Sequence, residues 1–526
     1  MNNPFISRTI SKTSDLSIDE QLYLYKKTKE LKEAYLKNPK DKKTLDKFRI
    51  NDLDFGIYHF FLEPSTRTKE SFWNASEFHR CKVNNLDIAS SSLKKKESYY
   101  DTIKTLVNYD NNIFIIRSKT EGLCTYLEDK LKKFSKRNNI LKPAFINGGD
   151  GEHEHPTQEE LDEFTFMEHM NGKRDYIHVA LIGDLLHGRT VHSKANGLKR
   201  FNEVKVDLIA PKIIQMPKTY VNIMKQNGFE VNVFENLKEY YNQKNIAPIH
   251  YFTRLQLERM GDTILQRKNE FEEAVTFKKE FLNLIPKNTK FYHPLPMNKE
   301  NPSIPDFIEE TKLNGWDVQS QNGYFWRIAL LSSIAGKIGN DFIGESIKEK
   351  NYIEDFILPI KPKNYIKKEI KEGITPISNG IVIDHICRGE NTKDIWKHLS
   401  LMHNILKIYD PGFMGVGESN QNSGIYKGLM AIPNYSKFNE KDIKRLSAVS
   451  PGCTLNIVKN NKVIEKYRLS MPPVIYGFEH TCCKNEKCIT SDEFEKVQLE
   501  FIKSKNNTFA CKYCDYEHSF KEIWKL

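Results

Sequence analysis

A buried strand that ends in a cluster of hydroxyl and guanidinium groups is the feature that most constrains this chain. Residues 57–62 are apolar, as in a buried strand, and a Pro-Ser-Thr sequence ends the run. The stretch 69–78 then has the pattern of the first turns of a helix. Backbone N–H groups, hydroxyls and the Arg67 guanidinium therefore meet at a helix N-terminus, which favours a phosphate. An ordinary helix N-cap is the alternative interpretation.

The same arrangement of a strand followed by a polar loop recurs up to about residue 340. Arg117 ends the apolar run 113–116, Arg254 follows the run 249–252, and a glycine-rich loop follows the strand at 144–146. Helical stretches separate these strands, and an apolar helix at 326–338 is expected to return to the first domain. Alternating strands and helices predict two open, mostly parallel sheets, whose ligands bind at the carboxyl ends of the strands.

The composition changes after Gly344. Residues 346–373 are rich in Lys, Ile and Pro without a clear period, which is typical of a linker. Short strands are expected from there on, at 380–386, 425–432 and 455–458. This pattern predicts an α+β module followed by a small cysteine-containing tail.

Length and composition fit a soluble protein of several domains. At 526 residues the chain exceeds one compact core, and its mean hydropathy is −0.59 with 39% hydrophobic residues. The sequence has no apolar run of membrane-spanning length and no signal-peptide pattern, so we expect a cytoplasmic protein with no membrane partner. The net charge of +11 comes mainly from dispersed lysines, which are usually a solvated surface but can attract anionic substrates.

Five of the nine cysteines lie between Cys482 and Cys514. Two close pairs, Cys483 with Cys488 and Cys511 with Cys514, are separated by 22 residues. Paired cysteines at such spacing in a chain without a secretion signal predict a tetrahedral zinc site. Free core cysteines are the alternative, and Cys482 is an additional neighbour that could compete with Cys483.

Five stretches occur in the order and approximate spacing of aspartate carbamoyltransferase, so residues 10–340 resemble that family. The stretches are Ser65-Thr66-Arg67-Thr68, His155-Pro156-Thr157-Gln158, Gly188-Arg189-Thr190-Val191-His192, Thr253-Arg254-Leu255-Gln256 and His293-Pro294-Leu295-Pro296. Ornithine carbamoyltransferase shares the first two. It usually carries His-Cys-Leu-Pro at the last stretch and a Ser-Met-Gly element in place of Arg254-x-Gln256, so the resemblance favours aspartate as the acceptor.

The resemblance implies a role for each matching residue. A carbamoyl phosphate site is implied, with a phosphate cradle, groups that polarise the carbonyl, and groups that hold the carbamoyl nitrogen: Ser65, Thr66, Arg67, Thr68, Arg117, His155, Gln158 and the carbonyls of Pro294 and Leu295. Thr68, Arg117 and His155 are the implied catalytic groups. The residues Arg189, Arg254 and Gln256 resemble the family's aspartate-binding groups, since the two carboxylates of aspartate are well bound by guanidinium groups. No catalytic cofactor is implied.

A polar loop rich in lysine matches a segment that the family inserts into a neighbouring active site. Ser91 and Lys95 align with the shared serine and lysine, which implies a homotrimer in which both residues bind carbamoyl phosphate and Lys95 is also a catalytic and aspartate-binding group. Lys96 stands where the family has Gly, so Lys94 could take the role instead. Met297 is a second departure, at a position where the family commonly has Arg.

The C-terminal part resembles the family's regulatory chain, here in the same polypeptide. The stretch 380–386 matches the start of its nucleotide-binding domain, and the matching nucleotide residues are Asp384, His385, Lys427 and Lys466. The match fails at Ala431, where the family has a second lysine, so we expect weak or absent CTP and ATP effects. The four paired cysteines match the family's structural zinc knot, one Zn²⁺ per chain: Cys483, Cys488, Cys511 and Cys514.

We therefore expect an α/β protein with two doubly wound parallel-sheet domains of the carbamoyltransferase fold, then an α+β regulatory domain and a small zinc-binding domain. The expected parts are a carbamoyl-phosphate domain, an aspartate domain, a returning helix, a linker, a nucleotide-binding-like domain and a zinc domain, at 1–165, 166–315, 316–345, 346–373, 374–470 and 471–526.

The expected function is aspartate carbamoyltransferase, the second step of pyrimidine synthesis, in a homotrimer that regulatory domains could enlarge. Three alternatives are an inactive homologue that only binds, an ornithine-type enzyme, and a zinc-ribbon protein that binds nucleic acid. The complete set of matching site residues disfavours the first, and the tail lacks a concentrated basic and aromatic face. We therefore expect no nucleic acid partner.

Overall fold

The computed structural model describes residues 3–87, 96–256, 267–298, 300, 302–347, 356–362, 377–406, 412–419, 424–435, 438, 440–479, 481–504 and 508–524. The chain forms two compact units. The first comprises Met1–Lys348 with Lys487–Glu495, and the second comprises Glu349–Glu486 with Lys496–Leu526.

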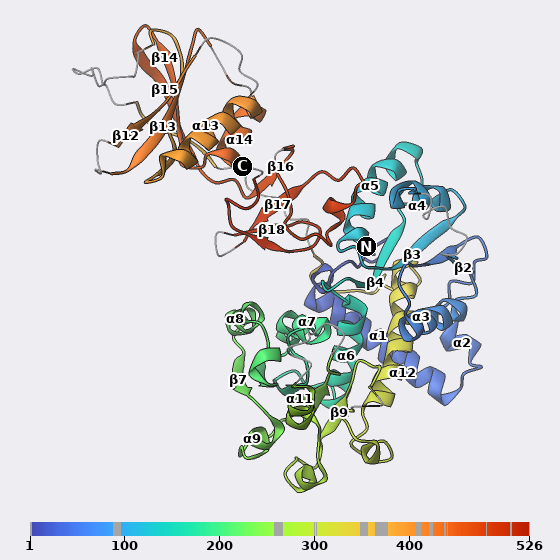
Figure 1. Ribbon diagram of the computed structural model, residues 1–526. Helices are drawn as coiled ribbons and strands as arrows, with labels where there is room; N and C mark the ends of the chain where they lie inside the picture. Colours follow the sequence, from blue (N-terminus) through green and yellow to red (C-terminus); the bar gives the residue numbers. More distant parts are fainter. Residues whose placement is uncertain are drawn as a thin grey trace. The chain divides into compact units, whose positions relative to one another are not determined.

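The first sheet of the first unit is entirely parallel, with the order β2-β1-β3-β4. Figure 1 labels its strands β2, β3 and β4. Its strands are β1 (Gly56–Phe61), β2 (Lys82–Asn85), β3 (Asn111–Ser118) and β4 (Ala144–Asp150). The helices around it are α1 (Ile18–Lys37), α2 (Lys42–Leu45), α3 (Thr66–Phe78), α4 (Tyr99–Val107), α5 (Leu123–Asn138) and α6 (Pro156–His169). Both parallel sheets of this unit confirm the prediction from the alternating pattern.

Apolar residues cover both faces of this sheet because side chains alternate along each strand. Ile113 and Ile115 pack into a core shared with α1, α3 and α12 (Trp316–Ile334). Phe114 and Phe145 point to the opposite face and stack with ring centroids 5.6 Å apart, on the side of α4 and α5. The sheet is therefore doubly wound.

Helix α12 starts ten residues before the expected apolar stretch at 326–338, at the first residue of the returning-helix region expected at 316–345, and it ends at Ile334. Fourteen of its 19 residues are buried, so it is covered by the core on most of its surface. It contacts α1, α3 and α6 and adds Trp326 to the first core, which confirms its return to the first sheet (Figure 1). The first half of α12 contains many polar residues, so only the stretch from residue 326 shows an apolar pattern in the sequence.

The second sheet is also parallel, with the order β7-β6-β5-β8-β9. Its strands are β5 (Tyr176–Ile182), β6 (Glu203–Ile209), β7 (Glu230–Phe234), β8 (Ile249–Phe252) and β9 (Lys290–Tyr292). The helices are α7 (Arg189–Gly197), α8 (Lys218–Gln226), α9 (Leu237–Tyr241) and α11 (Lys268–Val275). A separate apolar core surrounds this sheet, and Met297 packs against it.

A segment from the C-terminal part of the chain completes the first unit. The Glu121 N–H donates to the Lys487 carbonyl (2.8 Å), and the Ile489 N–H donates to the Glu121 carbonyl (2.9 Å). The buried Glu495 carboxylate accepts hydrogen bonds from the Tyr126 hydroxyl (2.7 Å) and the Tyr100 N–H (3.1 Å). These bonds fix 487–495 beside the N-terminal end of α5 (Leu123–Asn138).

The second unit contains a six-stranded antiparallel sheet with the order β10-β15-β14-β11-β13-β12, and a four-stranded sheet β16-β17-β18-β19. The larger sheet carries two helices and confirms the expected α+β module. Its elements are β10 (Ile357–Pro359), β11 (Gly380–Gly389), α13 (Thr392–Leu406), β12 (Phe413–Glu418), β13 (Tyr426–Pro433), α14 (Glu440–Val449), β14 (Thr454–Lys459) and β15 (Lys462–Leu469). The smaller sheet is β16 (Val474–Tyr476), β17 (Glu500–Lys503), β18 (Phe509–Cys511) and β19 (Glu517–His518).

The stretch expected to be a linker contains strand β10, which pairs antiparallel with β15. Three residues are too few for a periodic signal, and the partner strand lies about a hundred residues further on. Six short 3₁₀ helices complete the described structure: Thr13–Asp15, Leu198–Arg200, Lys212–Ile214, Lys279–Asn283, Asp306–Ile308 and Ile489–Ser491. No helix in the described parts is long and apolar enough to span a membrane.

Candidate active site

A cavity of about 510 Å³ lies in the first unit, where the C-terminal end of β3 and the loops after β1, β5, β8 and β9 meet the N-terminal ends of α3, α6 and α7. Twelve predicted site residues line it: Ser65, Thr66, Arg67, Thr68, Arg117, His155, Gln158, Arg189, Arg254, Gln256, Pro294 and Leu295. They come from both sheets and from positions up to 230 residues apart in the chain. Ser91 and Lys95 lie outside the described residues.

The N-terminal end of α3 forms one wall of the cavity. Ser65 is the N-cap residue, in an extended conformation, and its hydroxyl makes no capping bond to the helix. The backbone N–H groups of the first turn, unlike those further along, have no carbonyl partner within a helix. This end of α3 therefore presents donors and a partial positive charge to the cavity, together with Arg67.

Two guanidinium groups approach each other over a glycine at the end of β4. Arg117 donates from Nη1 to the Gly148 carbonyl (2.8 Å). A Cβ on Gly149 would lie 2.5 Å from Arg117 Nη1 and 3.1 Å from Arg189 Nη2, and its φ of 112° is unfavourable for other residues. Glycine at this position therefore lets both cations reach the same part of the cavity.

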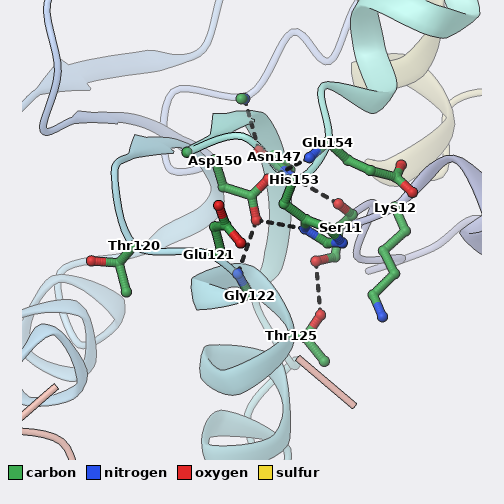
Figure 2. Close-up of polar contacts among 12 residues, drawn as sticks. Ser11, Lys12, Thr120, Glu121, Gly122, Thr125, Asn147, Asp150, His153 and Glu154 are labelled. Carbon is green, nitrogen blue, oxygen red and sulfur yellow. Dashed lines mark hydrogen bonds and ion pairs between the residues drawn. The ribbon is translucent and has the colours of Figure 1, made fainter. Parts of the chain in front are cut away.

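Asp150 organises the loop that leads from β4 to α6 (Figure 2). Its Oδ1 accepts from the Asn147 amide (2.9 Å) and the Glu154 N–H (3.0 Å), and its Oδ2 accepts from the Gly122 N–H (2.9 Å). Burial opposes ionisation, but His153, 3.1 Å away, and these donors bring the pKa of Asp150 below its ordinary value. The loop is thereby held in place up to the start of α6.

His155 is the residue immediately before α6, and it is nearly buried. Its Nε2 lies 3.4 Å from the Thr68 hydroxyl, and its Nδ1 lies 3.4 Å from the Thr157 hydroxyl. Burial, and then three nearby guanidinium groups, lower the pKa of His155 well below its ordinary value. The imidazole is therefore neutral at physiological pH and can donate a single N–H to a ligand.

The loops after β5 and β8 are tied together by the buried Asp184. Its carboxylate accepts from the Gln256 N–H (3.2 Å) and from the His187 N–H (3.0 Å). Arg189 begins α7 and donates to the Gly151 carbonyl (2.6 Å), on the loop from the first sheet. Arg254 and Gln256 thus face the cavity from the second sheet, while Arg189 connects the two sides.

The loop after β9 is closed by its own hydrogen bonds. The His293 N–H donates to the Gln319 side-chain oxygen (2.9 Å), and the Leu295 N–H donates to His293 Nδ1 (2.8 Å). Burial, with the charges of Arg67 and Arg254, lowers the pKa of His293 to about 3. A neutral His293 is what allows Nδ1 to accept the Leu295 N–H.

The cavity is also lined by residues to which the sequence assigned no role, although Thr253 and His293 stand in the matched stretches: Ser71, His187, Thr253, His293, Gln319 and Arg327. Arg327 lies in the apolar part of α12, donates to the Ser71 hydroxyl (2.7 Å) and stacks over the Phe72 ring at 4.7 Å. Burial lowers its pKa to about 10, although the charge of Asp162 opposes this. A lone arginine in an apolar helix was the signal that could have revealed it.

Among the described residues, the lining contains no carboxylate. It contains five arginines: Arg67, Arg117, Arg189, Arg254 and Arg327. Such a set suits ligands with several negative charges, because each guanidinium can make two parallel bonds to a phosphate or carboxylate. The fold and this cavity define a two-domain α/β protein that binds small polyanions between two parallel sheets.

The four predicted zinc ligands lie together. The Sγ atoms of Cys483, Cys488, Cys511 and Cys514 are within 4.8 Å of one another, and those of Cys483 and Cys514 are 3.7 Å apart. Cys482 Sγ instead lies 3.9 Å from the Glu522 carbonyl, outside this group. Four thiols at this separation fit one tetrahedral structural zinc.

Of the four residues matched to a nucleotide site, Asp384 and His385 lie on β11 and Lys427 lies on the adjacent strand β13, whereas Lys466 lies on β15, which β14 separates from β11. Lys427 Nζ contacts the Asp384 carboxylate at 2.8 Å, and His385 has a φ of 63°. Burial, then the charge of Lys427 and next that of Lys466, lowers the pKa of His385, against the effect of Asp384. Ala431 is 2% exposed on β13, four residues beyond Lys427.

Comparison with protein families matches four parts of the chain. The descriptions are aspartate/ornithine carbamoyltransferase carbamoyl-P binding domain at residues 8–168 and Asp/Orn binding domain at 175–334. The aspartate carbamoyltransferase regulatory chain matches at 372–470 with its allosteric domain and at 473–524 with its metal binding domain.

Similar proteins and structures agree with these matches. Protein PyrBI of Treponema denticola is 51% identical, covering 100% of this chain and 99% of that protein, and Protein PyrBI of Thermotoga maritima is 48% identical over all of both. The aspartate carbamoyltransferase catalytic subunit of Wigglesworthia glossinidia brevipalpis is 34% identical over 53% of this chain and 84% of that protein. Aspartate transcarbamoylase of Trypanosoma cruzi in complex with N-(phosphonacetyl)-L-aspartic acid has a TM-score of 0.53 at 25% identity, covering 63% of this chain and 97% of that one.

The chain belongs to the aspartate carbamoyltransferase family, a family of transferases, and carries the catalytic and the regulatory regions in one polypeptide. Its first unit has the carbamoyltransferase fold, and its last region is the family's metal-binding domain, with the four cysteines in place for zinc.

Proposed function

We propose that the cavity binds carbamoyl phosphate and L-aspartate together and transfers the carbamoyl group to the aspartate amine. The observation that carries this proposal is the convergence of five arginines and a neutral histidine on one cavity. The amine attacks the carbonyl carbon, a C–N bond forms, and the C–O bond to phosphate breaks. The proton lost by the amine leaves with the departing group as hydrogen phosphate.

The phosphate is assigned to the N-terminal end of α3. Ser65, Thr66 and Thr68 supply hydroxyls and backbone N–H groups there, and Arg67 supplies a guanidinium. These donors favour the phosphate dianion, and they favour it further as it departs with more charge on its oxygens.

The carbonyl oxygen of carbamoyl phosphate is assigned to Thr68, Arg117 and His155. Negative charge develops on this oxygen as the amine attacks, and fixed donors in a partly dry cavity stabilise it by about 2.7–4 kcal/mol for one donor. A neutral His155 can act only as a hydrogen-bond donor or a weak base, since its pKa lies well below the ordinary value. Positioning and electrostatics then supply the rate, without a covalent intermediate.

The remaining groups are assigned to the carbamoyl nitrogen and to the carboxylates of aspartate. Gln158 and the carbonyls of Pro294 and Leu295 are assigned to the carbamoyl nitrogen, and Arg189, Arg254 and Gln256 to the aspartate carboxylates. Residues 8–168 would then supply most of the carbamoyl phosphate groups, and residues 175–334 would supply the aspartate groups together with the carbonyls of Pro294 and Leu295.

The test is to incubate the purified chain with carbamoyl phosphate and either L-aspartate or L-ornithine, and to measure carbamoylated product and phosphate. Product with aspartate alone supports the proposal. Product with ornithine alone would overturn the choice of acceptor. Binding of both ligands without any product would identify an inactive homologue.

A trimer in the cytoplasm completes the proposal. The support is the match of Ser91 and Lys95 to residues that the family shares across a subunit boundary. Mixing inactive Lys95→Ala chains with inactive Arg254→Ala chains should restore some activity, because some sites then combine two intact sets. Verified mixed trimers without recovery would contradict sharing, or would point to Lys94.

A further inference from the structure

Asp162 lies directly behind the cavity and does not line it. It is fully buried on α6, one helical turn beyond Gln158. Its Oδ1 accepts from the side-chain amides of Gln158 (2.9 Å) and Gln319 (2.6 Å). Its Oδ2 accepts from the Tyr251 hydroxyl (2.7 Å) and from Lys194 Nζ (3.0 Å). Two oxygens with about four lone-pair positions thus meet four donors from four elements.

The carboxylate can only accept hydrogen bonds, and Lys194 beside it stabilises its negative charge. Both glutamines must therefore turn their NH₂ groups toward Asp162, which leaves their oxygens to face other partners. The Gln319 oxygen accepts the His293 N–H at 2.9 Å, at the start of the loop that carries Pro294 and Leu295. Gln158 lines the cavity, so its oxygen is the acceptor that it can offer to a ligand.

We propose that Asp162 is a positioning residue that makes the carbamoyl end of the cavity selective for an NH₂ group. It does so by fixing the amide orientation of Gln158 and, through Gln319, the loop whose carbonyls face the same ligand group. The inference rests on the proposed function, since the NH₂ group concerned is that of carbamoyl phosphate. A carbamoyl NH₂ donates two hydrogen bonds and so needs acceptors, whereas a methyl group in its place needs none.

Asp162→Asn changes this arrangement without changing its volume. Tyr251 and Lys194 both donate, so the amide oxygen of the substituted side chain turns toward them and its NH₂ group faces the two glutamines. The glutamines then reverse, and the Gln158 NH₂ meets the carbamoyl NH₂, donor against donor. A buried donor without an acceptor costs enough to weaken binding roughly ten- to a hundredfold.

The experiment compares carbamoyl phosphate with acetyl phosphate, in which a methyl group replaces the NH₂ group. For Asp162→Asn we expect kcat/KM to fall roughly ten- to a hundredfold more for carbamoyl phosphate than for acetyl phosphate, while KM for aspartate stays unchanged. A general loosening of the site would lower kcat/KM equally for carbamoyl phosphate and acetyl phosphate. The ratio of the two kcat/KM values would then stay unchanged, and that result would overturn the proposal. If the unaltered protein makes no product from carbamoyl phosphate, the proposed function itself fails, which is a separate outcome.

Two further variants make the test specific. Glu163→Gln is the matched control, because Glu163 is also fully buried and lies 3.6 Å from Lys194, but the structure shows no hydrogen bond from it to Gln158 or Gln319. It should leave the ratio for the two donors unchanged. Combining Asp162→Asn with Gln158→Glu gives residue 158 two side-chain oxygens, one to accept from the substituted residue 162 and one to accept from the carbamoyl NH₂. The double variant should therefore recover part of the lost preference in kcat/KM for carbamoyl phosphate over acetyl phosphate. No recovery would contradict the assigned polarity.

If Asp162→Asn does not fold, Gln319→Leu tests the second half of the proposal. It removes the acceptor of the His293 N–H and one donor to Asp162, so the loop with Pro294 and Leu295 loses its attachment. The kcat/KM for carbamoyl phosphate should again fall more than the kcat/KM for acetyl phosphate. An equal effect on both donors would overturn the role of the loop.

Discussion

Replacing Lys194 by Met should destabilise the first unit strongly, and more at high pH than at low pH. Lys194 is fully buried, and its Nζ lies 2.7 Å from Glu159, 3.0 Å from Asp162 and 3.6 Å from Glu163. Removing the cation leaves three buried carboxyl groups without their shared partner. Breaking a buried ion pair in this way costs roughly 3–5 kcal/mol. At roughly 2–4 °C per kcal/mol, the expected fall in Tm is roughly 6–20 °C.

The pH dependence follows from the Glu163 carboxyl. Burial raises the pKa of Glu163 well above its ordinary value, even though Lys194 opposes this, so without Lys194 the pKa rises further. A carboxyl whose folded pKa is raised contributes stability below its unfolded pKa and loses it as the pH rises through the folded pKa. The Tm difference between Lys194→Met and the unaltered protein should therefore be smaller at pH 5 than at pH 8.

The assay is thermal unfolding of the full chain at both pH values, with Lys29→Met as the matched control. Lys29 Nζ lies 3.9 Å from Glu33 on the exposed side of α1, with side chains 65% and 68% exposed. An exposed pair of this kind contributes roughly 0–1 kcal/mol, so the control should be close to the unaltered protein. A Lys194→Met variant as stable as this control at pH 8, or one that loses more stability at pH 5, would refute the reasoning.

Three other predictions concern the cavity, the metal and the nucleotide. Arg67→Ala should reduce turnover by roughly a hundredfold or more without a change in Tm, because Arg67 is exposed and is proposed to bind the phosphate; near-normal kcat would contradict the assigned phosphate site. Cys483→Ser should lose the one zinc per chain in native mass spectrometry while Cys482→Ser keeps it, since only Cys483 Sγ lies in the cluster of four; equal zinc content would reject this ligand set. Calorimetry should detect weak or no CTP binding, because Ala431 cannot make the charge-assisted bond of a lysine, and its absence lowers affinity roughly tenfold or more; tight binding with a shift in aspartate saturation would prove this wrong.

Strand ends were the part of the site that the sequence could predict. Arg117 and Arg254 follow apolar runs in different sheets, and the structure places both at one cavity, because the carboxyl ends of β3 and β8 both face it. The cysteine spacing located the metal ligands equally directly. Only the three-dimensional structure could separate Cys482 from Cys483, which are adjacent in the sequence but whose thiols have different neighbours.

Interactions between residues far apart in the chain were out of reach. Arg327 and Gln319 reach the cavity from a helix whose composition indicates core packing, and neither follows a strand. Asp162 meets Lys194, Tyr251 and Gln319, which are up to 157 residues away, and no local pattern announces such a group. Strand β10 was missed for the same reason, since its pairing depends on a distant partner strand.

Positive groups line the cavity, and acidic groups lie behind its wall. Five guanidinium groups line the cavity, whereas the carboxylates of Glu159, Asp162 and Glu163 lie behind it with Lys194 among them. The rear set includes its own compensating cation, while the front set has no carboxylate among the described lining residues. An anion that enters therefore meets donors already oriented by the fold, and the protein needs little rearrangement as charge develops during the reaction. The buried ion cluster thus contributes to catalysis by holding the front groups, through Asp162, in the geometry that the ligand requires.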